Sequence, residues 1–372
     1  MSDLHRLAGP GRGPNGVPAA IALSPILSAR YRGRDIERIR EAAPGARIVT
    51  ISSEGHADGP LDDVEVFLRG FISADTFDRV VARTPQLRWV HSASAGVESV
   101  LTPAVRDRDV VITNARGVFS RPIAEYVMLM ILAVSRRLPG LLELQRERTW
   151  QPLEGAELRD VTVGIVGLGS IGRDIASLAS AFGSRVIATR RRPEVGAADA
   201  DPVPADGSGD AEPRGDRLAD LDAGDRPLPP PRVERVLGPD GLPELLAESD
   251  FVVLAAPLTP DTENLIDEAA LAHFKPGAWL VNIARGRLVD EHALLRALDE
   301  GPLGGAVLDA FRDEPLPPSS PFYARPNVIA TPHTSWSSGR VLDRSVELFC
   351  ENLRRFATDR PLLNVVDRGA GY

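Results

Sequence analysis

Three glycines at a fixed spacing are the residues that most directly indicate chemistry. Gly167, Gly169 and Gly172 form the pattern G-x-G-x-x-G, which follows the apolar run Val161–Val166 and precedes a segment with helical spacing. In such a turn the first glycine permits the tight bend, the second lets the backbone approach a pyrophosphate, and the third permits close helix–strand packing. The helix N-terminus supplies free N–H groups for the phosphates. The pattern predicts a dinucleotide site, with a purely structural glycine turn as the alternative.

A run of arginines after the next predicted strand, Arg185–Ala188, bears on the choice of dinucleotide. An acidic residue about 20 positions past the motif normally holds the ribose 2′-hydroxyl of NAD, whereas this chain has Arg190 and Arg191 there. Guanidinium groups attract a 2′-phosphate in bidentate geometry. We therefore expect NADP (NADPH) to be favoured over NAD. The alternative is a GC-rich coding bias, since Lys275 is the only lysine.

Alternating strands and helices must position these residues. Short apolar runs predict strands at Ala20–Leu23, Arg47–Ile51, Val64–Leu68, Leu87–His91, Val110–Thr113, Val161–Val166, Arg185–Ala188, Phe251–Ala255, Trp279–Ile283, Gly305–Leu308 and Val328–Ala330. Helical spacing predicts helices at Gly33–Ala43, Ala74–Arg83, from Ser120 to Pro139, from there to about Trp150, at Arg173–Phe182 and at Gly339–Ala357. This order is typical of an α/β fold whose parallel sheets are covered on both faces.

Composition excludes several classes of protein. The chain has 372 residues, enough for two domains, and its net charge of −9 argues against a nucleic-acid binder. No apolar run reaches the roughly 20 residues that a membrane span needs. Cys350 is the only cysteine, which excludes an internal disulfide and a cysteine-based metal site. We expect a cytoplasmic protein that binds no nucleic acid, membrane or metal.

Two segments do not fit the alternating pattern. The segment 194–231 holds ten acidic and three basic residues, seven prolines and no aromatic residue. It buries too little apolar surface to offset the entropy lost on ordering, so we expect a disordered acidic insertion. Residues 1–18 are rich in Gly and Pro, and we expect a disordered tail.

Four short motifs occur in order in the C-terminal half: Asn282–Gly286, Leu308–Phe311, Asp313–Leu316 and Thr331–Trp336. This ordered set resembles the D-isomer-specific 2-hydroxyacid dehydrogenase family, which includes glyoxylate/hydroxypyruvate reductases, phosphoglycerate dehydrogenases and D-lactate dehydrogenases. The resemblance extends from about residue 60 to 368, apart from the acidic insertion.

The resemblance implies a catalytic set of Arg285, Glu314 and His333, and the chemistry agrees. Reduction of a 2-oxo acid needs a hydride at the carbonyl carbon and a proton at its oxygen, for which histidine is a suitable donor near neutral pH. A carboxylate such as Glu314 fixes the tautomer and stabilises the imidazolium. Arg285 would hold the substrate carboxylate and polarise the carbonyl. His91 matches no motif of the family and is expected to be structural.

The resemblance also implies contacts outside the catalytic set. Cofactor contacts are expected at Ser170, Ile171, Pro257, Thr262, Ala284 and Asp309, the last as an acceptor for the nicotinamide amide. The loop with Ala95 and Gly96 would offer backbone N–H groups to the substrate carboxylate. Arg69 stands at the end of a strand, where ligand contacts cluster in open α/β sheets, and is a further candidate for substrate binding.

Members of this family have two lobes. The resemblance implies a Rossmann cofactor-binding domain at 138–335 and a discontinuous, flavodoxin-like substrate-binding domain at 19–137 plus 336–372. It also implies a homodimer that associates through the cofactor lobe.

The function that these features favour is an NAD(P)-dependent D-2-hydroxyacid dehydrogenase, or 2-oxo acid reductase, with glyoxylate or hydroxypyruvate as substrate and NADPH preferred. One alternative is a phosphoglycerate or other D-hydroxyacid dehydrogenase. Another, from a different class, is a dinucleotide-sensing binding protein of the corepressor type.

Overall fold

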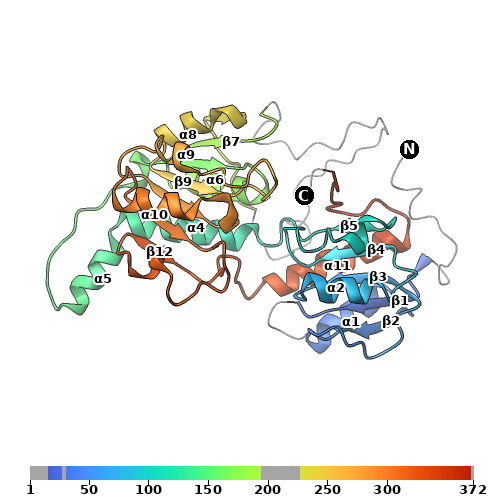
Figure 1. The fold of residues 1–372 in the computed structure, drawn as a ribbon. Coiled ribbons are helices and arrows are strands. Elements are labelled where there is room, and N and C mark those ends of the chain that lie inside the picture. The colour runs from blue at the N-terminus through green and yellow to red at the C-terminus, as the bar shows by residue number, and fades with distance from the viewer. Residues whose placement is uncertain (1–15, 27–30, 194–226, 370–372) are drawn as a thin grey trace. The chain divides into compact units, whose positions relative to one another are not determined.

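The chain folds into two α/β units, each built on a parallel sheet (Figure 1). The structure, a computed structural model, describes residues 16–26, 31–193 and 227–369. Within these, unit 1 comprises 16–26, 31–119 and 339–369, and unit 2 comprises 120–193 and 227–338. The predicted α/β class is thereby confirmed.

Unit 1 contains a five-stranded parallel sheet in the order β2-β1-β3-β4-β5. Its strands are β1 (Ala20–Leu23), β2 (Arg47–Thr50), β3 (Val64–Arg69), β4 (Trp89–Ser92) and β5 (Val111–Thr113). Its helices are α1 (Gly33–Ala42), α2 (Ala74–Val81), α3 (Pro103–Arg106) and α11 (Val341–Ala357). All residues of β1, β3 and β4 are buried, as expected for parallel strands covered on both faces.

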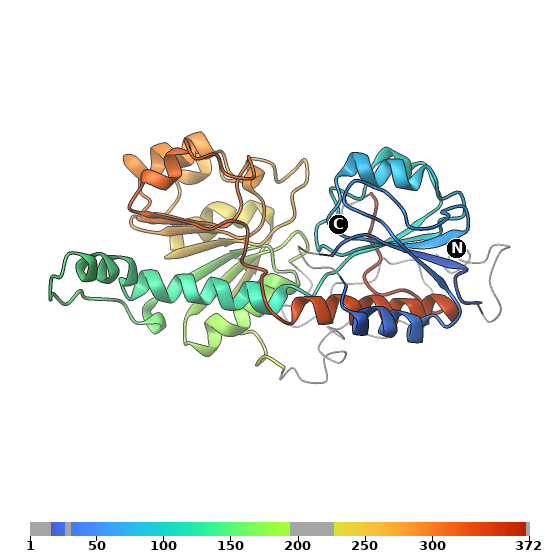
Figure 2. The same cartoon turned by 90° about the horizontal axis from the view of Figure 1, so that it is seen from below.

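The two faces of this sheet belong to two separate apolar clusters. Ile21 and Leu23 of β1 pack with α1 and α11 on one face, while Ala20 and Ala22 pack with α2 and α3 on the other. Figure 2 shows α1 and α11 side by side beneath the sheet. This alternation follows from the two-residue period of a strand. The last helix of the chain therefore completes the core of the first unit.

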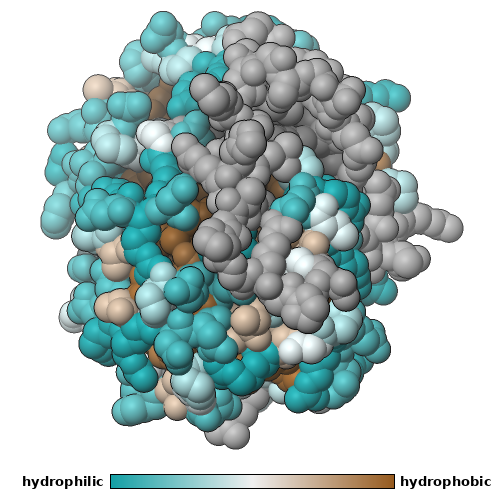
Figure 3. Space-filling model, turned by 90° about the vertical axis from the view of Figure 1, so that its right-hand side faces the viewer, coloured by the Kyte–Doolittle hydropathy of each residue, from teal (hydrophilic) through white to brown (hydrophobic). Residues whose placement is uncertain are grey.

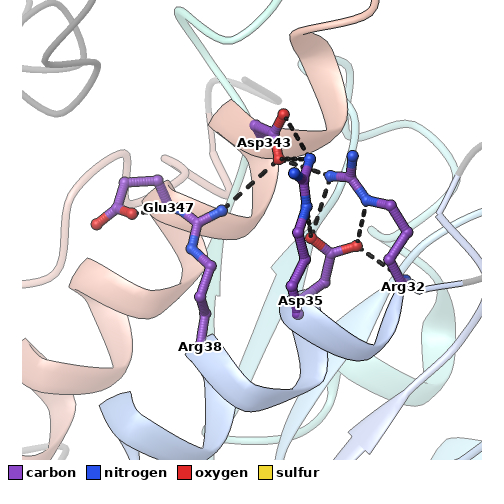
Figure 4. A network of polar contacts seen from close by, with 6 residues as sticks. Arg32, Asp35, Arg38, Asp343 and Glu347 are labelled. Carbon is purple, nitrogen blue, oxygen red and sulfur yellow. Dashed lines mark hydrogen bonds and ion pairs between the residues drawn. The ribbon is translucent and has the colours of Figure 1, made fainter.

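Ion pairs between charged side chains also link α11 to α1 (Figure 4). Asp343 accepts from Arg32 at 2.5 Å, and Arg38 pairs with Glu347. Asp35 is fully buried and accepts from Nε of Arg32 at 2.9 Å. Most of these groups are half-exposed, so each pair contributes at most about 1 kcal/mol.

Unit 2 contains a seven-stranded parallel sheet in the order β12-β11-β10-β9-β6-β7-β8. Its strands are β6 (Thr162–Val166), β7 (Arg185–Thr189), β8 (Arg235–Leu237), β9 (Phe251–Leu254), β10 (Trp279–Asn282), β11 (Gly305–Leu308) and β12 (Val328–Ala330). Its α-helices are α4 (Ser120–Ser135), α5 (Leu138–Arg146), α6 (Ser170–Ala181), α8 (Leu242–Glu248), α9 (Glu268–Leu271) and α10 (Glu291–Asp299). Short 3-10 helices lie at Leu158–Asp160, Pro239–Gly241, Gly286–Leu288 and Pro321–Ala324.

The order of strands in unit 2 creates a switch point. From β6 the chain proceeds outward to β7 and β8, and it then returns to the other side of β6 with β9. In open α/β sheets a ligand binds in the crevice outside the carboxyl ends of the strands at such a reversal. The glycine turn follows β6, so it lies at this position.

Several boundaries differ from those that the sequence predicts. Unit 2 begins at Ser120 rather than at 138, because α4 packs against α6, and it ends at 338 rather than 335. Ser120 is the first residue of α4 and not its cap. The sequence did not predict β8, which is three residues long and only partly buried.

The two segments expected to be disordered lie mostly outside the described residues, which exclude 1–15 and 194–226. Their remaining residues are placed in the structure. Pro18 is buried and Val17 packs on the core of unit 1. At the end of the insertion, the hydroxyl of Ser177 on α6 donates to the carbonyl of Pro229. The expected disorder is therefore wrong for 16–18 and 227–231.

Most of the described surface on the face shown in Figure 3 is hydrophilic. Helix α5 differs, because it carries four leucines and none of its residues is buried. It stands apart from the rest of unit 2 in Figures 1 and 2. Within the described residues no helix combines the length and the apolar character needed to cross a membrane.

Candidate active site

The glycine turn after β6 has the geometry of a phosphate cradle. Gly167 has φ of +101°, and a Cβ there would lie 2.7 Å from the backbone nitrogen of Ala256. A Cβ on Gly172 would lie 2.2 Å from the carbonyl oxygen of Gly167. A Cβ on Gly169 would meet no described atom within 4 Å. The first and third glycines are thus required by packing, while the second leaves space at the N-terminus of α6 that a pyrophosphate fits.

Arg190 and Arg191 lie beside this turn because β7 is the neighbour of β6. Thr189, the last residue of β7, pairs with Val166, and its carbonyl accepts from the N–H of Gly167 at 3.1 Å. Arg190 is half-buried and Arg191 is exposed. The two guanidinium-bearing residues therefore begin one residue past the strand, at the edge of the sheet that carries the glycine turn.

The other predicted cofactor positions follow the same edge. Ser170 and Ile171 form the first turn of α6, and Ala284 lies just past β10. After β9, the hydroxyl of Thr262 donates to the carbonyl of Pro257 at 2.7 Å, which closes that loop on itself. These residues fit a dinucleotide laid across the carboxyl ends of β6, β7, β9 and β10.

His333 and Glu314 form a hydrogen-bonded pair in unit 2. Nδ1 of His333 lies 2.8 Å from Oε2 of Glu314, and both side chains are 36% exposed. Because a carboxylate only accepts, Nδ1 carries the proton and Nε2 is the nitrogen left for another partner. Oε1 of Glu314 accepts from the backbone N–H of Phe311 at 2.9 Å, which fixes the carboxylate from the other side.

The ionised form of Glu314 is favoured in this setting. Partial burial raises the pKa of its carboxyl, but hydrogen bonds from His333 and Phe311 and the charges of His333 and Arg285 outweigh burial and lower it. Glu314 is thus held as a carboxylate beside the imidazole, which is the state that stabilises an imidazolium.

Arg285 approaches this pair through a glycine. A Cβ on Gly286 would lie 1.9 Å from the backbone carbon of Phe311, so only glycine permits this loop to reach the one that carries Glu314. Asn282, the last residue of β10, braces the loop by donating to the carbonyl of Arg285 at 2.9 Å and accepting from the N–H of Ala284 at 3.1 Å. The structure therefore brings all three predicted catalytic residues together.

Asp309 lies deeper than its predicted role implies. Its side chain is fully buried. Its carboxylate accepts from the hydroxyl of Thr331 at 2.6 Å, and from the N–H groups of Thr334 at 2.8 Å and Ser335 at 2.9 Å. The carboxylate thus binds the loop that carries His333, whatever it contributes to a cofactor.

The predicted substrate contacts belong to unit 1. Arg69 ends β3 and is 7% exposed; its guanidinium donates to the carbonyl of Ile72 at 2.6 Å and lies over the ring of Phe77. After β4, the carbonyls of Ala95 and Gly96 accept from Asn114 at 2.9 Å and from Ser94 at 2.7 Å. These bonds use the carbonyl groups of the loop.

Sequence reasoning missed two residues: Asn282, which braces the loop of Arg285, and Tyr126 of α4, whose hydroxyl lies 2.6 Å from the hydroxyl of Thr331. Asn282 could have been found from the sequence, because it ends an apolar strand and lies three residues before Arg285-Gly286. Tyr126 offered no such signal, because it lies within a helix far from the motifs in sequence.

Comparison with known proteins places these features in a family. Residues 128–207 and 226–335 match the model of the NAD-binding domain of D-isomer specific 2-hydroxyacid dehydrogenases. A glyoxylate reductase of Aeropyrum pernix is 32% identical over 303 residues, which are 78% of this chain and 79% of that protein.

A D-3-phosphoglycerate dehydrogenase of Mycobacterium bovis is 34% identical over 302 residues, 80% of this chain and 51% of that protein. This chain thus spans about half the length of that relative. The crystal structure of an NADPH-dependent glyoxylate/hydroxypyruvate reductase from Sinorhizobium meliloti, in complex with NADP and sulfate, matches with a TM-score of 0.74 at 28% identity, over 95% of this chain and 100% of that one.

Proposed function

This chain belongs to the D-isomer-specific 2-hydroxyacid dehydrogenase family, and from that premise we propose that it reduces small 2-oxo acids, such as glyoxylate or hydroxypyruvate, with NADPH preferred. The observation that carries the proposal is the His333–Glu314 pair, with Arg285 close by, at the sheet edge that holds the glycine turn.

In this proposal His333 is the proton donor. Its protonated Nε2 gives a proton to the carbonyl oxygen of the substrate, and the carboxylate of Glu314 stabilises the imidazolium before transfer. Arg285 binds the substrate carboxylate and polarises the carbonyl. A bound nicotinamide supplies the hydride for the carbonyl carbon. The product is the 2-hydroxy acid, and oxidation runs through the same groups in reverse.

The preference for NADPH rests on Arg190 and Arg191. They occupy the position where NAD-binding proteins usually have an acidic residue, and their guanidinium groups attract the 2′-phosphate that an acid would repel. The similar enzyme of Sinorhizobium meliloti is NADPH-dependent, which supports the same choice here. Changing both arginines to alanine should raise KM for NADPH much more than KM for NADH. Equal effects on the two cofactors would contradict this assignment.

The substrate contacts expected at Ala95, Gly96 and Arg69 are a further part of the proposal. The carbonyls of Ala95 and Gly96 are bound by Asn114 and Ser94. We propose that the N–H groups of the loop with Ala95 and Gly96 bind the substrate carboxylate and that the guanidinium of Arg69 also contacts the substrate. Replacing Arg69 by methionine, which keeps an apolar stem over Phe77, should raise KM for the oxo acid and leave the Kd of NADPH unchanged.

A panel of oxo acids tests the proposed activity. Oxidation of NADPH and NADH is followed in parallel with glyoxylate, hydroxypyruvate, 3-phosphohydroxypyruvate and pyruvate. The highest kcat/KM is expected with NADPH and one of the first two acids. A preference for the phosphorylated acid would favour a phosphoglycerate dehydrogenase. Tight binding of NADPH without turnover of any acid would favour a dinucleotide-sensing binding protein.

Helix α5 is the surface that we propose for a homodimer. It has nine residues, none of them buried, and Leu138 and Leu142 are 42% and 43% exposed. Trp150, in the segment that follows, is fully exposed. A helix this short is marginal in water unless a partner covers its apolar face. A second copy of the chain is the partner that the family resemblance favours, while the cytoplasmic location stays a prediction from sequence.

Sedimentation equilibrium tests this interface. The wild-type protein should have twice its chain mass of 40.0 kDa. Leu138→Glu with Leu142→Glu should yield a monomer. Phe182→Glu, a change at another exposed apolar residue of unit 2, is the control and should stay dimeric. A monomeric wild type would contradict the proposal.

A further inference from the structure

The loop that carries His333 is anchored on both sides of the histidine by one carboxylate. Thr331 precedes His333, and Thr334 and Ser335 follow it; all three donate to Asp309. His333 itself has φ of +48°, in the left-handed region that non-glycine residues rarely adopt. A backbone held in this region persists only where its surroundings over-determine it. The bonds to Asp309 are that constraint.

The hydrogen bonds that hold the His333 loop extend to helix α4, as a count of the hydroxyl protons shows. The carboxylate of Asp309 only accepts, so the hydroxyl of Thr331 uses its one proton on Asp309. The hydroxyl of Tyr126 lies 2.6 Å from the same Thr331 oxygen. Since Thr331 has no second proton, Tyr126 is the donor in that bond. The chain of donors therefore runs in one direction, from Tyr126 to Thr331 to Asp309.

The state of Tyr126 agrees with this direction. The pKa of its phenol is raised to about 12, mainly by burial; the hydrogen bond with Thr331 lowers the pKa and the negative charge of Asp309 raises it. The phenol therefore keeps its proton at neutral pH and stays a donor. Ionisation would leave it with nothing to donate to Thr331.

We propose that Tyr126 is a positioning residue for the proton donor, which it holds through Thr331 and Asp309. The phenol fixes the rotamer of Thr331, Thr331 and the two amides fix the loop around Asp309, and the loop directs the imidazole of His333 toward Glu314 and the substrate. The inference rests on the proposed function, because it assigns His333 its role in turnover.

Kinetics of matched variants test the chain. Tyr126→Phe removes the donor and keeps the ring, and kcat should fall roughly five- to tenfold, the effect expected from one lost hydrogen bond. KM for the oxo acid and Kd for NADPH should change by less than about twofold. Tyr323→Phe is the control, because that tyrosine is 59% exposed. Thr331→Ser should keep most of the activity that Thr331→Val loses.

A double-mutant cycle tests whether the residues act as one unit. If Tyr126 acts only through Thr331, adding Tyr126→Phe to Thr331→Val should reduce kcat no further. Multiplying effects would overturn the proposal, as would an unchanged kcat in Tyr126→Phe.

A readout that needs no turnover separates this inference from the proposed function. Hydrogen exchange at the amides of Thr334 and Ser335 should speed up at least threefold in Tyr126→Phe and more in Thr331→Val, with no change in Tyr323→Phe. Unaltered exchange overturns the positioning chain. A wild type that turns over no oxo acid, yet shows this exchange pattern, would contradict the proposed function and leave the chain standing.

Discussion

Two histidines, one in each unit, show how the hydrogen-bond partner and the solvent exposure of an imidazole determine its role. His91 lies in β4 of unit 1, fully buried, with Nδ1 2.7 Å from the hydroxyl of Thr113. His333 follows β12 of unit 2, 36% exposed, with Nδ1 2.8 Å from the carboxylate of Glu314. Both imidazoles have a single oxygen partner at Nδ1, and the charge of that partner differs.

The difference decides which protonation state each site supports. Burial against the aromatic rings of Trp89 and Phe349 lowers the pKa of His91 to about 3, because it disfavours the charged imidazolium. His91 is thus a neutral core residue. Glu314 supplies a negative charge beside His333, whose side chain has access to solvent. A histidine is suited to proton transfer when a carboxylate lies beside its ring and the ring has access to solvent.

Removal of the exposed histidine should have the largest effect. His333→Ala deletes the proton donor, so kcat should fall by roughly 10³-fold. The Kd for NADPH, measured by fluorescence titration, should stay within about twofold. His91→Gln is the matched variant and should retain kcat. Surviving turnover in His333→Ala would show that another group donates the proton.

Removal of the charge from its partner should come next. Glu314→Gln keeps a hydrogen-bond acceptor but no longer stabilises the imidazolium, so kcat for reduction should fall by roughly 10²-fold. Steady-state kinetics at saturating NADPH measure this loss. An unchanged kcat would mean that the charge of Glu314 is not needed for turnover.

The buried histidine should control stability toward acid. Its folded-state pKa of about 3 lies below the ordinary value of 6.5, so the unfolded chain binds more protons between these pH values. Stability should therefore fall as pH drops through 6.5 toward 3, by about 1.4 kcal/mol per pH unit. In His91→Gln this contribution disappears. The difference in unfolding free energy between pH 7 and 5, from urea titrations, should shrink by about 2 kcal/mol.

His273→Gln, which removes an exposed histidine, is the control for that measurement and should show the wild-type dependence on pH. A parallel loss in both variants would indicate a general effect of histidine removal.

An exposed charge pair should have the smallest effect. Asp343 is 38% exposed and pairs with Arg32 and Arg34. Asp343→Asn should lower the unfolding free energy by at most about 1 kcal/mol, and 1 M salt should remove most of the difference. A loss above about 2 kcal/mol would show that pairing, and not exposure, governs the strength of these charges.

Most strands of the two sheets were predicted from the sequence, because buried parallel strands are continuous apolar runs. The strands Val161–Val166 and Gly305–Leu308 illustrate this, as both are apolar and both occur within a residue of their predicted bounds. The strand β8 was missed because it is short and half-exposed at the edge of the sheet. The unit boundary was misplaced because α4 is one continuous helix whose membership is decided by packing on α6.

The candidate site was predicted as far as its motifs reach. Arg285, Glu314 and His333 each stand in a short motif, and the structure brings them together. The chain through Tyr126 was not predictable, because it joins residues 205 positions apart and depends on the direction of hydroxyl protons. Hydrogen bonds of this kind leave no pattern in the neighbouring residues of one sequence.

The placement of α11 has a consequence for the order in which the two units can fold during synthesis. Phe349, Leu353 and Phe356 of this helix cover Trp89 and the face of β1 that carries Ile21 and Leu23. A ribosome synthesises these first strands long before it reaches α11, and all of unit 2 emerges in between. Unit 2 is complete before α11 emerges, whereas unit 1 keeps an apolar face uncovered until α11 has been made. Nascent unit 1 therefore exposes an apolar surface that is prone to aggregation.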